Sequence, residues 1–114
     1  MVLENLVKTQ INKNIKYIYF YRLTKEKVDI TYDLSIVSLQ SYGIEIERQS
    51  IIKDKLIDVC RDSVMSISPD RYKVHKLLRL LYENQVSPIH LVDIIGDYVD
   101  EYILDFDKEI KSMA

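Results

Sequence analysis

The sequence predicts an α+β domain in which a four- to five-stranded antiparallel sheet is followed by a C-terminal antiparallel helical hairpin packed on one sheet face. The period of the apolar residues carries this prediction. Before residues 66–69 they recur at every second position, and after them at helical spacing. Polar residues alternate cleanly with the apolar ones, which is typical of half-buried antiparallel strands and not of a parallel sheet.

Length and composition favour one folded domain over residues 1–114. A chain of 114 residues, 47% hydrophobic and 30% charged, is long enough to bury a core without disulfides or metals. We expect a β-rich part over about residues 1–66, two helices over about 68–107, and a mobile tail over 108–114.

Three segments predict strands most clearly. IKYIYFYRLT (15–24) and VDITYDLSI (28–36) both alternate, and the polar TKEK between them predicts a hairpin loop. YGIEIER (42–48) alternates again, with Gly43 marking a turn or a bulge where it begins.

Two further segments have weaker patterns. Residues 3–11 are compatible with an N-terminal strand that turns through Asn12–Asn14. Residues 51–64, IIKDKLIDVCRDSV, fit either a helix or a turn at 53–55 followed by a strand.

The motifs ISPDRY and VSPIHL predict two helix starts of the same design. Ser68 and Ser87 are expected as N-caps, because a serine hydroxyl accepts a hydrogen bond from a free backbone N–H of the first turn. Pro69 and Pro88 suit the first helical position, where the N–H would have no partner.

The expected helices cover about residues 69–84 and 88–106. The apolar stripe of the first consists of Val74, Leu77, Leu78 and Leu81, widened by Leu80 and Tyr82. That of the second consists of Leu91, Ile95, Tyr98, Val99, Tyr102 and Phe106. The short connection ENQV favours antiparallel neighbours.

The segments YGIEIE, RD…IS (61–68) and VSPIHLVD resemble a family of short bacterial proteins, chiefly of Gram-positive anaerobes, known only as a domain of unknown function. The likeness covers roughly residues 15–106. It implies an antiparallel sheet followed by two helices, and it favours a strand over 55–62. Gly96 stands where the resemblance implies an acidic residue. No activity, cofactor or partner is implied.

Charge and cysteine content limit the partners and the compartment. The formal net charge is -2, whereas a protein that binds duplex DNA usually carries a basic surplus, so we expect no duplex DNA partner. A single cysteine, Cys60, fits a reducing compartment. The first ten residues hold no apolar signal segment, and no run is long enough to span a membrane. We therefore expect a cytoplasmic protein without a membrane partner.

No catalytic or metal-binding constellation is visible. Two histidines and one cysteine show no metal-ligand spacing, and no phosphate-binding loop or nucleophile elbow is present. We predict no metal, no cofactor and no catalytic residue. His90 is a weak ligand candidate, because the start of a helix keeps an imidazole neutral, although simple packing at the helix start explains it more economically. His75 is expected at the surface.

Tyr17, Tyr19 and Tyr21 are the main functional hint. They share one side of the 15–24 strand, and Ile18 and Phe20 occupy the other, so both sides are apolar. The helices must cover one side. The other would then be an exposed aromatic patch, as is common at protein interfaces. The alternative is a central strand packed on both sides.

Acidic residues supply a second hint. Asp93, Asp97 and Asp100 make the second helix acidic, whereas the first is basic. DNA phosphates would repel such a second helix, but a basic partner would not. Glu45 and Glu47, with Asp29 and Asp33 on another strand, form either an acidic patch or a solvated sheet face.

These features favour a non-enzymatic cytosolic interaction or regulatory module. It would bind a protein partner or its own copy through the tyrosine face or the acidic side of the second helix. The alternative is single-stranded nucleic-acid binding through the tyrosine strand and the basic first helix. A third hypothesis is a small enzyme or ligand-binding protein that uses His90.

Overall fold

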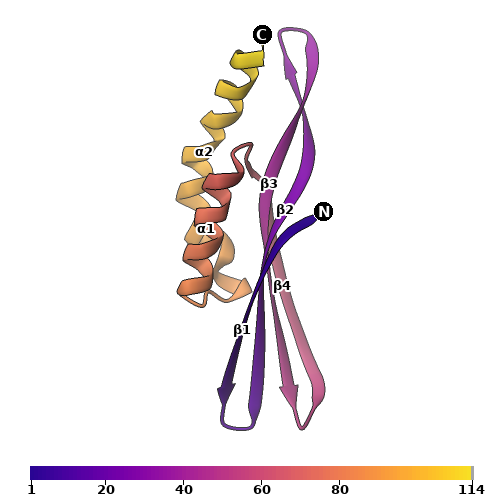
Figure 1. Ribbon diagram of the computed structural model, residues 1–114, viewed down its shortest axis with the longest axis vertical. Helices are drawn as coiled ribbons and strands as arrows, with labels where there is room; N and C mark the ends of the chain where they lie inside the picture. The colour runs from indigo at the N-terminus through magenta and orange to yellow at the C-terminus, as the bar shows by residue number, and fades with distance from the viewer. Residues whose placement is uncertain (114) are drawn as a thin grey trace.

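A four-stranded antiparallel meander, covered on one face by two helices, forms the molecule in the computed structural model, which describes residues 1–113 (Figure 1). The strands lie in sequence order: β1 (Val2–Asn12), β2 (Ile15–Tyr32), β3 (Ser35–Ile52) and β4 (Lys55–Ser68). They are followed by α1 (Arg71–Glu83), the 3-10 turn η1 (Pro88–His90) and α2 (Leu91–Met113). The predicted α+β class is confirmed.

Both segments with weak patterns are strands. β1 includes residues 3–11 and turns at Lys13–Asn14, and β4 includes residues 55–62. β4 pairs with β3 along most of its length, so its backbone hydrogen bonds are satisfied in the sheet and not within a helix.

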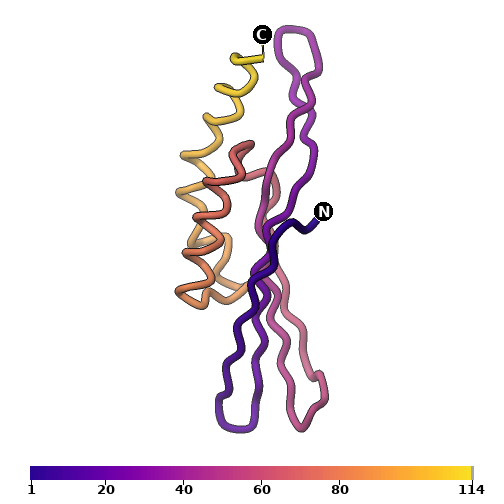
Figure 2. The backbone as a smooth tube through the Cα atoms, viewed as in Figure 1, coloured from indigo at the N-terminus to yellow at the C-terminus, as the bar shows by residue number. Residues whose placement is uncertain are grey.

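The predicted hairpin loop at TKEK is wrong. β2 continues through residues 24–27 to Tyr32, and the chain turns at Asp33–Leu34, where the predicted second strand would have passed. Beyond Thr24 and Tyr42, β2 and β3 pair only with each other, as a two-stranded ribbon at one end of the molecule (Figure 2). Polar residues are tolerated inside such a strand because water reaches much of its surface.

The bulge predicted at Gly43 is confirmed. The register between β3 and β4 shifts between Tyr42 and Ile44, where β4 holds two more residues than β3. A Cβ atom on Gly43 would lie 2.6 Å from the carbonyl oxygen of Val64. A glycine is needed there because the β4 backbone passes too close for any side chain.

Helix α1 begins two residues later than expected. Its N-cap is Asp70, whose carboxylate accepts hydrogen bonds from the backbone N–H groups of Tyr72 and Lys73. The prediction of Ser68 as the cap is wrong, because Ser68 ends β4, where it pairs with Tyr42.

Before α2, Pro88 begins the short 3-10 turn η1, and Ser87 precedes it without a side-chain capping bond. The Ser87 hydroxyl instead accepts a hydrogen bond from the Arg48 guanidinium at 3.3 Å. α2 continues to Met113, well beyond the expected end near 106, because Ile110 adds another buried turn.

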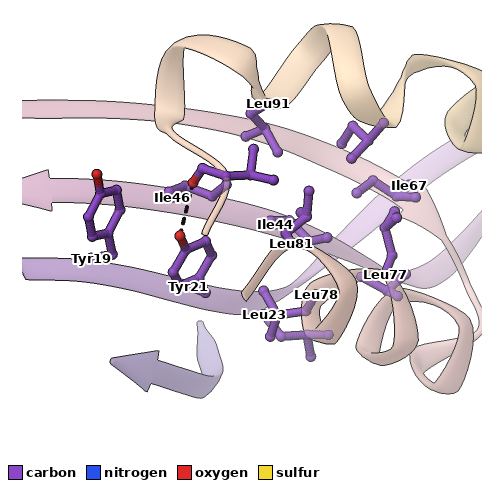
Figure 3. Close-up of a cluster of buried hydrophobic side chains, with 13 residues drawn as sticks. Tyr19, Tyr21, Leu23, Ile44, Ile46, Ile67, Leu77, Leu78, Leu81 and Leu91 are labelled. Carbon is purple, nitrogen blue, oxygen red and sulfur yellow. Dashed lines mark hydrogen bonds between the residues drawn. The ribbon is translucent and has the colours of Figure 1, made fainter. Parts of the chain in front are cut away.

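The core lies between the helices and one sheet face. The predicted stripe of α1 is confirmed, since Val74, Leu77, Leu78 and Leu81 are all buried, whereas Leu80 is exposed. Figure 3 shows these leucines facing the β2 and β3 side chains. A second, smaller cluster joins Leu39 of the β2–β3 ribbon to Phe106 and Ile110 of α2, so α2 is packed at both ends.

Candidate functional site

The tyrosine row of β2 lies beneath the helices. The Tyr21 side chain is 0% exposed and the Tyr19 side chain 7%, and their rings stack with centroids 6.2 Å apart (Figure 3). The Tyr21 hydroxyl donates a hydrogen bond to the Val86 carbonyl oxygen at 3.0 Å. Burial, reinforced by the nearby Tyr19 and Tyr82, raises the pKa of Tyr21. The expectation of an exposed tyrosine face is therefore wrong for Tyr19 and Tyr21. Because these two rings are buried, they do not form a platform on which bases could stack.

Tyr17 is the exception within that row. It is half-buried near the end of the helices, and the Arg48 guanidinium lies 5.7 Å from its ring centroid. One partly covered ring beside a cation does not make an extended aromatic surface.

The other side of the same strand is uncovered. Both helices lie on the tyrosine side of the sheet (Figure 1), so the alternate side chains of all four strands form what we call the outer face. Next to the β1–β2 and β3–β4 turns most of its side chains are apolar, with Thr9, Lys16 and Gln49 lying among them. No described element covers the patch made by Val7, Ile11, Ile18, Phe20, Ile51, Leu56 and Val59.

A network of ion pairs borders this apolar patch. Arg22 binds Glu45 at 2.7 Å and Glu47 at 3.2 Å, and Arg61 binds Glu47 at 2.8 Å. The Arg22 guanidinium also lies 4.9 Å from the ring centroid of Phe20. Two arginines and two glutamates leave this region without net formal charge.

Glu47 is the most deeply placed of these four groups. Burial opposes its ionisation, but hydrogen bonds from Gln49 and Arg22 and the positive charges of Arg22 and Arg61 outweigh burial and lower the pKa of Glu47. The glutamates therefore neutralise arginines and do not combine with Asp29, which lies on the ribbon and accepts a hydrogen bond from Ser38.

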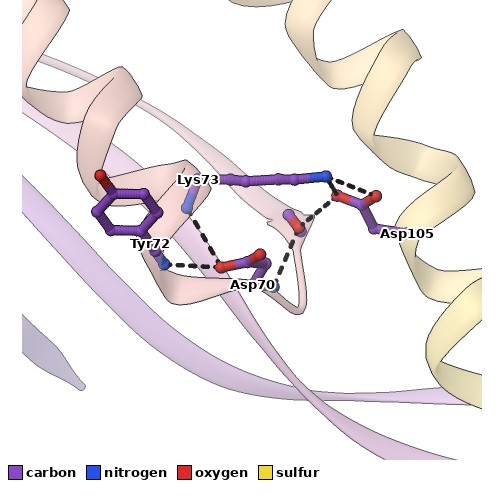
Figure 4. Close-up of polar contacts among 5 residues, drawn as sticks. Asp70, Tyr72, Lys73 and Asp105 are labelled. Carbon is purple, nitrogen blue, oxygen red and sulfur yellow. Dashed lines mark hydrogen bonds and ion pairs between the residues drawn. The ribbon is translucent and has the colours of Figure 1, made fainter.

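The carboxylates of α2 divide into two kinds. Asp93, Asp97 and Asp100 are exposed, and none forms an ion pair with any described residue. Asp105 faces α1 instead, where Lys73 Nζ lies 2.9 Å from both of its carboxylate oxygens (Figure 4).

Asp105 ties the end of β4 and the start of α1 to α2. The Ser68 hydroxyl donates to its Oδ2 at 3.0 Å and accepts a hydrogen bond from the Asp70 backbone N–H (Figure 4). Burial opposes ionisation, but the hydrogen bonds from Lys73 and Ser68 outweigh burial and lower the pKa of Asp105. This pair is part of the architecture, since it holds three elements together.

The two histidines lie in different surroundings. His90 is exposed on the wall of a shallow cavity of about 480 Å³. That cavity has no acidic lining, since it is bounded by Leu80, Leu81, Asn84, Gln85, Val86, Ser87, His90 and Ile94. His75 is hydrogen-bonded through Nδ1 to Glu4 Oε1 at 2.6 Å, between α1 and β1.

Within residues 1–113 no group of three histidine, cysteine or acidic side chains is placed to hold a metal ion. Among the same residues, neither helix is long and apolar enough to cross a membrane.

Comparison with known proteins assigns a family and no function. Residues 1–101 match the family described as "Family of unknown function (DUF6514)". No curated protein and no solved structure matches the chain.

Proposed function

Because the chain belongs to the DUF6514 family, whose function is unknown, we propose a function from its surface: a non-enzymatic interaction module that self-associates through the outer face of its sheet. The observation that carries this proposal is the apolar patch on the outer face. Val7, Ile11, Leu56 and Val59 are exposed there beside Phe20. A largely apolar patch on the uncovered face of a folded domain marks an interaction site.

The apolar patch and the ion pairs that border it span about seven residues on each of the four strands. Strands lie about 4.8 Å apart and rise about 3.3 Å per residue, so this region presents roughly 450 Å² of flat area, which side-chain relief increases. A stable interface covers about 800 Å² of accessible surface on each partner, so the outer face suits an interface at the small end of the range.

The charge balance of the outer face favours a second copy of this chain as the occupant. Arg22 and Arg61 are neutralised by Glu45 and Glu47 on the same copy, and Lys16 adds one positive charge to the face, so two identical faces repel each other little. A two-fold axis through the patch places apolar side chains of one copy against those of the other. Two sheets packed in this way lie about 10 Å apart, as in a β-sandwich.

We further propose that the module works in the cytoplasm. The support is Cys60, the single cysteine of the chain, which is half-buried and forms no disulfide within the described residues. An unpaired thiol is best kept reduced in that compartment.

Light scattering during gel filtration tests the self-association. We expect a dimer for the wild type and a monomer for Phe20→Glu, because a buried carboxylate without a partner disfavours the apolar contact. Val59→Lys, at an exposed position on β4, is expected to have the same effect. The matched control is Tyr72→Glu on α1, an exposed aromatic residue away from the sheet, which should remain dimeric.

Far-UV circular dichroism separates a lost interface from a lost fold. Both outer-face variants should keep the wild-type spectrum, since neither residue belongs to the core. A wild type that stays monomeric at the highest attainable concentration would end the proposal. So would a folded Phe20→Glu or Val59→Lys variant that is still a dimer.

A further inference from the structure

A second apolar surface runs along α2. Val92, Gly96, Val99, Ile103, Phe106 and Ile110 follow one another at spacings of four, three, four, three and four residues. This is the heptad spacing that keeps side chains on one side of a helix and lets two helices pack together. We call this row the α2 seam.

The second half of the α2 seam is covered, and in the first half Val99 packs partly against the main core. Phe106 and Ile110 are buried against Leu39 of the β2–β3 ribbon. In the first half Val92 is 54% and Ile103 60% exposed, and a Cβ on Gly96 would meet no atom within 4 Å.

A cavity adjoins the exposed half. It measures about 450 Å³, and Ile103, Phe106 and Asp107 lie on its helical side, with Val28, Ile30 and Ser66 on the other. An apolar side chain of a partner would fill it.

The α2 seam points away from α1. Asp105 lies on the side of α2 that faces α1, because it binds Lys73. Ile103 lies about 160° round the helix axis from Asp105. Ile94 also lies on the α1 side, where it shares a cavity with Leu80. On the seam side of residues 92–103, Val99 meets the core, whereas Val92, Gly96 and Ile103 are left open to another helix.

Aspartates border the α2 seam on its solvent side. Asp93, Asp100 and Asp107 each lie one heptad apart, directly after Val92, Val99 and Phe106 in sequence. All three are exposed and none forms an ion pair with a described residue. The opposite flank, with Ile95 and Tyr102, packs on the sheet. A partner helix therefore meets the aspartate flank.

This acidic flank excludes a second copy of α2. In an antiparallel pair of α2 helices the two aspartate flanks would face each other. In a parallel pair the aspartate flank of one copy would face the other flank of the second copy, which already packs on the sheet. Flanking charges of one sign select a partner of the other sign. The occupant that fits is a short helix with an apolar row bordered by lysine or arginine.

We propose that the α2 seam binds a basic amphipathic helix of another protein along residues 92–103. This inference goes beyond the proposed self-association, because α2 and the outer face lie on opposite sides of the sheet (Figure 1). Both surfaces can be occupied at once, which would make the dimer a bivalent adaptor for such helices.

Fluorescence anisotropy with two labelled synthetic peptides tests this proposal on the full chain. Both peptides are three-turn helices with a leucine row; one has lysine along the flank and the other glutamate. We expect the lysine peptide to bind and the glutamate peptide not to. The double variant Asp93→Lys, Asp100→Lys should bind the lysine peptide about tenfold more weakly, because exposed ion pairs contribute about 0.2–1 kcal/mol each. The same variant should bind the glutamate peptide.

Two further variants separate seam binding from general charge attraction. Ile103→Asp should weaken the lysine peptide at least tenfold while the chain stays folded and dimeric. Glu101→Lys changes the charge next to Asp100 but on another side of α2, and should leave affinity within about twofold.

Three results would overturn the proposal: no binding of the lysine peptide to the wild type, equal effects of Asp100→Lys and Glu101→Lys, or dissociation of the dimer by Ile103→Asp. The peptide readout is independent of the outer-face variants, so its failure is distinct from failure of the self-association.

Discussion

The two glycines show how the same residue type serves opposite needs. At Gly43 the β4 backbone leaves no room for a Cβ, whereas at Gly96 the space is open. We expect Gly43→Ala to lower the free energy of unfolding by about 1–3 kcal/mol, the usual range for overpacking. Gly96→Ala should raise it by about 0.5–1 kcal/mol, because alanine loses less backbone entropy in a helix.

Urea denaturation of both variants measures these changes. The pair controls itself, since the substitution is identical and only the surroundings differ. A Gly43→Ala variant as stable as the wild type would mean that β4 can move away from β3 at the bulge without loss.

The side of β2 that meets the helices was beyond prediction from β2 itself. Both of its rows are apolar, and β3 decides between them: Ile46 lies opposite Tyr21, whereas Glu47 lies opposite Phe20. The row beside the isoleucines becomes the core, and the row beside the glutamates becomes the outer face. That pairing depends on the position of the β2–β3 turn, which the polar TKEK segment disguises.

At the level of elements, the hairpin turns explain why the strand lengths were not predicted from the sequence. Asp33 and Leu34 both have positive φ angles, of 50° and 66°, as do Lys53 and Asp54, of 50° and 63°. Two-residue hairpin turns with this geometry usually contain glycine or asparagine. Without them the turn at Asp33–Leu34 carries no mark, although the polar residues at 53–55 still indicated a turn as one alternative. Strands of 18 residues, about three times the common length, are therefore not anticipated.

The helices were easier to predict, because their apolar faces repeat over several turns and need no partner to define them. Val74, Leu77, Leu78 and Leu81 of α1 are buried as expected. Only the ends of the helices differ. Ser68 belongs to β4, so Asp70 caps α1, and Ile110 extends α2 because the β2–β3 ribbon is long enough to meet it.

The Asp105 contact predicts how acid affects the junction of β4, α1 and α2. The pKa of Asp105 is lowered in the folded state, so its contribution to stability is complete above the ordinary value of 3.8 and is lost as pH falls through the lower folded-state value. Asp105→Asn should therefore be less stable than the wild type at neutral pH, and its stability should fall less steeply below pH 4.

Thermal unfolding followed between neutral pH and pH 2 measures this difference. Asp97→Asn, at an exposed carboxylate without an ion pair, serves as the matched control and should follow the wild-type curve. Parallel curves for Asp105→Asn and the wild type would contradict the assignment.

The whole molecule is long and thin. Its extents are 57 × 21 × 19 Å and its Cα radius of gyration is 16.6 Å, whereas a compact domain of this length has about 13 Å. The ribbon at one end and two hairpin turns at the other produce this length (Figure 2). Elongation exposes more surface than a sphere would, and the outer face adds to it because both helices lie on the other side of the sheet.

Small-angle X-ray scattering checks this shape on the Phe20→Glu variant, which we expect to be monomeric. We expect a radius of gyration close to 16.6 Å, with a pair-distance function skewed towards long distances. A value near 13 Å would mean that the ribbon folds back on the rest of the molecule in solution.

The two rows of side chains on β2 differ in how well they tolerate substitution. Tyr21 and its row secure the architecture, while Phe20 and its row contribute little to it. Substitutions on the second row can therefore accumulate without unfolding the chain. Related proteins can therefore gain or lose the proposed dimer contact during evolution while they keep the same fold.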